Sequence, residues 1–196
     1  MTLSILLLLT LYTIIVVSLI WARFRFFKIY PGASRISSIF YDPTVVIHIL
    51  ATYYYMIVSP VEMAIYVTLA AAIYMISLLL FWWSLRTAKQ LDFAFSKNVG
   101  EIITNGPFGF IRHPFYVSYV LCWLTSSLLF NSYLLWITLT YLIFFYFISA
   151  RREENVILKS THSTEYASYK KEIGMFLPRV TQWKSWFIGK SNPKAN

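Results

Sequence analysis

The chain has 196 residues, of which 58% are hydrophobic, 19% aromatic and only 13% charged, and its net charge is +9. Soluble domains are about half apolar and a quarter charged, so this composition is typical of a membrane protein and excludes an ordinary soluble enzyme. A single cysteine excludes a disulfide framework or a metal site built from cysteines.

Five stretches of the chain contain no charged residue. They are residues 2–21, 44–58, 63–85, 114–130 and 133–150. Stretches of about 15 to 23 residues fit a hydrocarbon core of about 30 Å, so we expect an all-α integral membrane protein with five transmembrane helices. The first stretch lacks the basic region of a secretory signal. Asp42 and Pro43 are expected to begin the second helix, and Glu62 after Pro60 the third.

The basic residues divide the connecting loops into two classes. All 17 Lys and Arg residues follow the first, third or fifth stretch, and the loops after the second and fourth stretches contain none. The positive-inside rule then places the N-terminus outside and the C-terminus in the cytoplasm. Because topology explains the charge, no nucleic-acid partner is expected. The predicted location is the inner membrane of a bacterium or the endoplasmic reticulum of a eukaryote.

One membrane domain over residues 1–196 is expected, since no internal repeat or flexible linker is visible. It divides into three N-terminal helices (1–85), a polar region (86–180) that carries the candidate site residues, and a basic interfacial tail (181–196). Ser163 is expected to cap a short helix that ends before Gly174. His48 lies within the second stretch, either bonded to a neighbouring helix or handling protons.

The last two stretches are joined by only Asn131 and Ser132, so they must form a tight antiparallel hairpin. His113 and Ala150 are equidistant from this turn, at about 27 Å for a rise of about 1.5 Å per residue. The hairpin therefore brings residues 112–113 beside residues 151–152, with two glutamates, residues 153 and 154, within one further turn. Pro114, at the first helical position, leaves a helix N-terminus open to an anion. Residues 100–110 are expected to cover this cytoplasmic site.

The residues of this region resemble a known family, the integral-membrane methyltransferases typified by isoprenylcysteine carboxyl methyltransferase, with phospholipid N-methyltransferases as more distant relatives. The matching motif residues are Thr104, Gly106, Arg112, His113, Pro114, Tyr116, Glu153, Glu154, Tyr166, Tyr169 and Pro178. The match covers roughly residues 90 to 180.

The resemblance implies S-adenosylmethionine as the methyl donor, bound without a Rossmann fold, and no metal. It implies that the cofactor contacts Gly100, Glu101, Ile102, Ile103, Phe108, His113, Pro114, Phe115, Tyr116 and Glu154. The expected catalytic residues are His113, Glu153 and Arg151. His113 or Glu153 would serve as the base where the acceptor arrives protonated. The expected substrate is a lipidic or amphipathic molecule that enters from the cytoplasmic leaflet.

Two positions depart from the family pattern. Phe108 stands where relatives often have a tyrosine, and Ala150 where enzymes that methylate prenylcysteine carry an arginine, so either Arg151 or Arg152 would have to replace it. Two other functions stay open. Membrane sterol and enone reductases that use NADPH carry a similar Arg-His-Pro motif, and a non-enzymatic membrane scaffold could keep the same fold.

Overall fold

The structure, a computed structural model, describes residues 3–25, 35–59, 61, 63–88 and 102–179. Within these ranges the chain is helical, which confirms the predicted all-α class. The elements are α1 (Leu3–Arg25), α2 (Arg35–Val58), α3 (Ala64–Thr87), the short 3-10 helix η1 (Gly106–Gly109), α4 (Pro114–Phe130), α5 (Tyr133–Ile157) and α6 (Ser163–Glu172).

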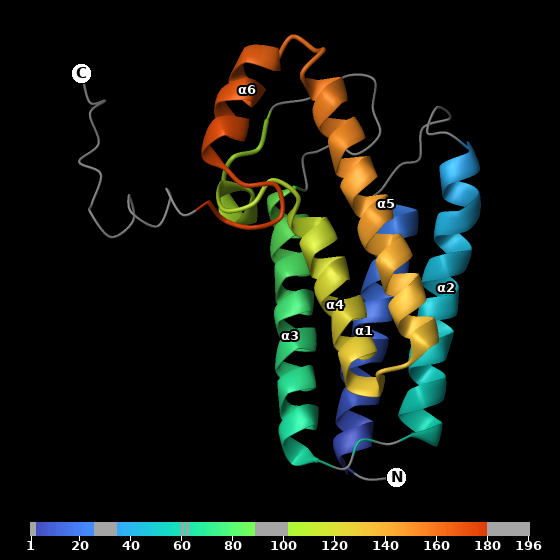
Figure 1. Cartoon of the computed structure of the whole chain (residues 1–196). Coiled ribbons are helices and arrows are strands. Elements are labelled where there is room, and N and C mark those ends of the chain that lie inside the picture. The colour runs from blue at the N-terminus through green and yellow to red at the C-terminus, as the bar shows by residue number, and fades with distance from the viewer. Residues whose placement is uncertain (1–2, 26–34, 60, 62, 89–101, 180–196) are drawn as a thin grey trace, which may run out of the picture.

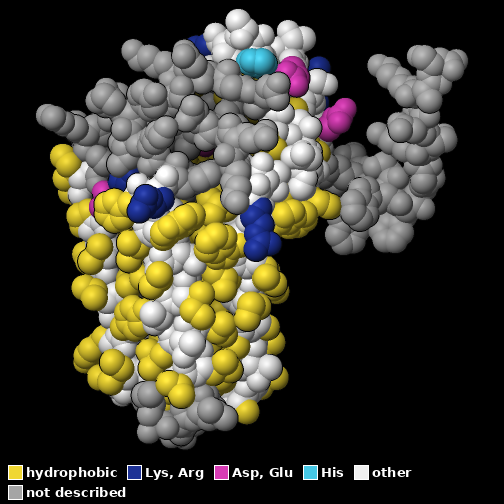
Figure 2. Space-filling view, turned by 180° about the vertical axis from the view of Figure 1, so that it is seen from behind, with side chains coloured by type: hydrophobic (Ala, Val, Ile, Leu, Met, Phe, Trp, Pro, Cys, Tyr) yellow, Lys and Arg dark blue, Asp and Glu magenta, His cyan; other side chains and the backbone are white. Residues whose placement is uncertain are grey.

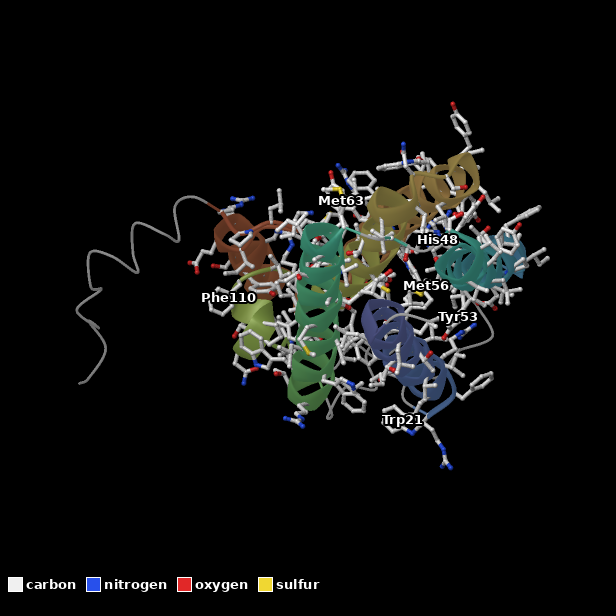
Figure 3. All side chains as sticks on the ribbon, turned by 90° about the horizontal axis from the view of Figure 1, so that it is seen from below. Trp21, His48, Tyr53, Met56, Met63 and Phe110 are labelled. Carbon is white, nitrogen blue, oxygen red and sulfur yellow. The ribbon has the colours of Figure 1, made fainter. Side chains whose placement is uncertain are left out.

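The five long helices form an elongated bundle, and α6 and η1 lie together at one end of it (Figure 1). Helix α3 packs along α4 and α1, and helix α5 packs along α2 and α4. In the view along the bundle, His48 and Met56 lie on the side of α2 that faces the other helices, whereas Trp21 lies at the outer edge of α1 (Figure 3). The ring nitrogen Nδ1 of His48 lies 2.8 Å from Thr138 Oγ1, so the expected bond to a neighbouring helix is present.

In the part of the chain that the structure describes, three helices are long and apolar enough to cross a membrane, namely α1, α3 and α5. Their outward surface is largely hydrophobic, and Lys and Arg side chains gather where this surface gives way to the end that carries α6 (Figure 2). Soluble monomers rarely expose so much apolar surface, which supports a membrane protein. Helix α4 is apolar but shorter, at 17 residues. The crossing of the membrane by α2 and α4, and the sidedness of the bundle, stay predictions.

The start of α2 was predicted wrongly. The helix begins at Arg35 and runs through Pro43, rather than beginning at Asp42 and Pro43. Proline interrupts the hydrogen bonding of a helix, but contacts with two other helices hold this segment in place. Asp42 pairs with Arg23 of α1 at 3.3 Å, and the ring of Tyr41 stacks on Phe145 of α5 at 4.5 Å. Pro60 and Glu62, expected before α3, lie outside the described residues.

The predicted hairpin of α4 and α5 is confirmed. Asn131 ends α4 in the left-handed conformation, with a φ of 45°, and its amide donates to the carbonyl of Ser127 at 2.9 Å. Asparagine tolerates this conformation better than most residues, so the chain can reverse in two residues. Helix α5 then runs beyond Ala150 to Ile157, which carries both glutamates to the end of the bundle where α4 begins.

The short helix expected near residue 163 is α6, although its first turn differs from the prediction. His162 occupies the N-cap position and Ser163 is the first helical residue, so Ser163 does not cap the helix. The hydroxyl of Ser160 accepts a hydrogen bond from the amide of His162 instead, at 3.2 Å. Gly174 lies past the end of α6, as predicted.

Candidate functional site

The loop before α4 and the loop after α6 run side by side through backbone hydrogen bonds. The amide of Arg112 donates to the carbonyl of Gly174 at 2.9 Å, and the amide of His113 donates to the carbonyl of Met175 at 3.1 Å. A Cβ atom at Gly174 would lie 1.8 Å from the carbonyl oxygen of Leu177, so only glycine fits this turn. The loop after α6 therefore holds the N-terminus of α4 in place.

The side chain of Arg112 connects α5 with the end of α6. It is buried, and its Nε donates to Glu154 Oε1 at 2.8 Å. Its Nη1 donates to the carbonyl of Lys170 at 3.3 Å and also to the carbonyl of Ile173. The last carbonyls of a helix lack partners within the helix, so Arg112 satisfies two acceptors at the C-terminus of α6 while it neutralises a glutamate on α5.

Glu154 is the centre of this cluster. Its side chain is 1% exposed, and three basic groups approach it, two from the loop before α4 and one from α6. Arg112 and His113 share Oε1, the latter through Nε2 at 3.2 Å, and Lys170 Nζ lies 2.7 Å from Oε2. A buried carboxylate needs partners for its charge, and here hydrogen bonds at Oε1 and the ion pair at Oε2 supply them.

His113 lies between two carboxylates. Its Nε2 faces Glu154 and its Nδ1 lies 3.5 Å from Glu153 Oε2. Neutral imidazole has a single N–H, so two carboxylate partners favour the doubly protonated ring. Burial lowers the pKa of His113, but hydrogen bonds to the two glutamates and their negative charges outweigh burial and raise the pKa above its ordinary value. The ring stacks on Tyr116 at 5.6 Å, and the Tyr116 hydroxyl donates to Glu153 Oε1.

Aromatic side chains extend the site from α4 towards η1 and α6. The ring of Phe115 lies 6.3 Å from that of Phe108 and 5.9 Å from that of Phe81 on α3. The Tyr169 hydroxyl of α6 donates to the carbonyl of Phe108 at 2.7 Å. Gly106, with a φ of +54°, allows η1 to approach α3 closely.

The structure brings most of the predicted site residues together. His113, Pro114, Phe115, Tyr116, Glu153 and Glu154 converge at the start of α4, with Phe108 beside Phe115. Ile102 packs against the buried residues of α6, and Ile103 is half-buried. Gly100, Glu101 and the basic tail at 181–196 lie outside the described residues.

The arginines of α5 are not part of this cluster. Arg151 is exposed, with its Cζ 5.0 Å from the centre of the Phe147 ring, and Arg152 is also exposed. We expected Arg112 to lie beside both, but its side chain contacts Glu154 instead. Successive residues of a helix point in different directions, so Glu154 of α5 is buried while Arg151 and Arg152 are exposed.

Sequence reasoning missed Lys170 and the backbone pairing of the loop after α6. A signal for Lys170 was present: Tyr166, Tyr169, Lys170 and Ile173 follow one another at helical spacing, and the other three are buried. A lysine on an otherwise apolar helical face indicates a paired charge.

Comparison with known proteins gives one family. A family model described as phospholipid methyltransferase matches residues 61–164, more than half of the chain, including α3, α4 and both glutamates of α5. No curated protein and no solved structure matches the chain significantly. Among the described residues, no group of three or more His, Cys, Asp or Glu is arranged to hold a metal ion.

Proposed function

The chain belongs to the phospholipid methyltransferase family, and from this premise we propose that it is an S-adenosylmethionine-dependent membrane methyltransferase with a lipidic or amphipathic acceptor. The family indicates a membrane methyltransferase and hence a methyl donor. The observation that carries the choice of donor is the buried carboxylate of Glu154 beside the N-terminus of α4.

The residues of the site suit the charges of this donor, which carries a carboxylate, an ammonium group and a ribose. The helix dipole at the N-terminus of α4 would attract the carboxylate, with the ring of His113 at the same end of the helix. Glu154 would accept hydrogen bonds from the ammonium group or from ribose hydroxyls. Aromatic contacts would come from Phe108, Phe115 and Tyr116. Residues 100–103 would add contacts, partly through the backbone.

When bound, the cofactor supplies a methyl group attached to a positively charged sulfur atom. After the methyl group is transferred, the sulfur remains in the cofactor as a neutral thioether. The protein then needs mainly to position the reactants and to balance charge. Where the acceptor arrives protonated, Glu153 is the better base, since both ring nitrogens of His113 already face carboxylates. Glu153 is also partly exposed, at 29%, and would take the proton of the acceptor.

The acceptor would reach Glu153 from the lipid side of the bundle, because the site lies at the end of an apolar surface (Figure 2). By the positive-inside rule this end faces the cytoplasm. Arg151, exposed near Phe147 on the same helix as Glu153, would contact the acceptor rather than the cofactor.

The test is calorimetric titration of the detergent-purified protein with S-adenosylhomocysteine, the product form of the donor. We expect micromolar binding that Glu154→Gln abolishes and that Arg152→Met, an exposed change on the same helix, preserves. Phe115→Ala serves as a second site variant in case Glu154→Gln does not fold. Absence of binding by folded wild-type protein would overturn the proposal, and binding of NADPH in a parallel titration would favour a reductase.

A further inference from the structure

Both carboxylate oxygens of Glu154 are engaged in this structure. Oε1 receives Arg112 and His113, and Oε2 faces the ammonium group of Lys170 at 2.7 Å. The proposed function requires Glu154 to receive the cofactor as well. Oε1 already has two partners, so the cofactor's cationic amino group would reach Oε2, where it meets the ammonium group of Lys170. Two like charges at one oxygen repel each other, so one of them is favoured to give way.

Burial and hydrogen bonding identify which side chain can leave. Arg112 is 4% exposed in its side chain and is also bonded to two carbonyls of the α6 terminus. His113 is 9% exposed and is fixed by Glu153 and by its own backbone amide. Lys170 is 38% exposed, so its ammonium group can exchange a carboxylate partner for water at low cost.

We propose that Lys170 is an exchangeable counter-ion that occupies the position of the cofactor's amino group. In the donor-free protein its Nζ neutralises Glu154 Oε2. When the cationic amino group of the cofactor takes this oxygen, the Lys170 side chain turns out into solvent. This inference rests on the proposed function, and it adds a residue of α6 that determines how tightly the donor and its product are held.

Helix α6 need not move for this exchange. The carbonyl of Lys170 accepts from Arg112, and the loop that follows pairs with the backbone of residues 112 and 113. These contacts use backbone atoms of α6 and its loop, so they persist when the Lys170 side chain leaves. The exchange therefore differs from an undocking of α6, which would expose the buried rings of Tyr166 and Tyr169.

Removal of the competing ammonium group provides the first test. In calorimetry with S-adenosylhomocysteine, Lys170→Met is expected to bind about threefold to tenfold more tightly than wild type, the effect of removing one partly exposed ion pair. Lys171→Met is the matched control, because Lys171 is an exposed neighbour whose loss changes the net charge equally. Weaker binding by Lys170→Met would mean that Lys170 contacts the cofactor directly, and binding equal to the control would mean that Lys170 has no role; either result overturns the proposal.

Chemical labelling of the wild-type protein provides the second test and needs no variant. An acetylating ester reacts with free amines, and mass spectrometry reports Lys170 and Lys171 separately. We expect S-adenosylhomocysteine to raise the labelling rate of Lys170 several-fold and to leave that of Lys171 unchanged. If calorimetry shows binding while Lys170 stays as protected as before, the exchange does not occur. If neither wild type nor Lys170→Met binds, the proposed function itself fails, and this inference fails with it.

Discussion

Replacing Arg112 by methionine is expected to loosen α6 from the rest of the protein. The change removes the 2.8 Å contact to Glu154 and leaves the carbonyls of Lys170 and Ile173 without the guanidinium. Breaking a buried ion pair by removing one partner costs about 3–5 kcal/mol. Because His113 and Lys170 still face Glu154, we expect the lower end, about 3 kcal/mol. For a chain of this size, that loss lowers Tm by about 6–12 °C.

Two measurements check this expectation in detergent-purified protein. The Tm of Arg112→Met is compared with that of Arg152→Met, which removes an exposed arginine from α5. Hydrogen exchange then compares the amides of residues 111–113 and of α6 with those of α4. We expect protection to be lost first in residues 111–113 and α6, because Arg112 joins these segments. A Tm within about 2 °C of the control, or uniform loss of protection, would refute the role given to Arg112.

Three further predictions concern other parts of the structure. Gly174→Ala should lower Tm by several degrees, because its Cβ would lie 1.8 Å from the Leu177 carbonyl oxygen, and an unchanged Tm would show that this turn relaxes freely. The pKa of His113 is higher in the folded protein than in the unfolded chain, where it is about 6.5. Protonated His113 therefore stabilises the fold fully below about pH 6.5, and this stabilisation is lost as the pH rises through the pKa of the folded state. The Tm difference between wild type and His113→Gln should therefore shrink as the pH is raised above about 6.5, and a growing difference would contradict this assignment. His48→Leu, which removes the bond to Thr138, should cost about 1 kcal/mol of stability and leave binding of S-adenosylhomocysteine unchanged, and loss of binding in a folded protein would contradict a purely structural role for His48.

The sequence alone determined the helical class, the hairpin and the family. Long uncharged stretches can satisfy their backbone in lipid only as helices, so α1, α3 and α5 could be predicted from composition. The two-residue connection at Asn131 required an antiparallel pair, and that pair brought His113 to the level of Glu153 and Glu154. These predictions depend on local or nearly local geometry.

The contacts of the charged side chains could be determined only from the tertiary structure. The start of α2 at Arg35 accompanies contacts of Asp42 and Tyr41 with α1 and α5, and the sequence around Pro43 does not reveal these contacts. In the same way, Arg112 contacts Glu154 and the end of α6 instead of lying beside the arginines of α5. Lys170 joins the same cluster from α6, a helix whose position relative to α4 and α5 cannot be deduced from spacing in the sequence. The energy of a buried charge depends on every group around it in three dimensions. These groups come from distant parts of the chain, so spacing along the sequence does not identify them.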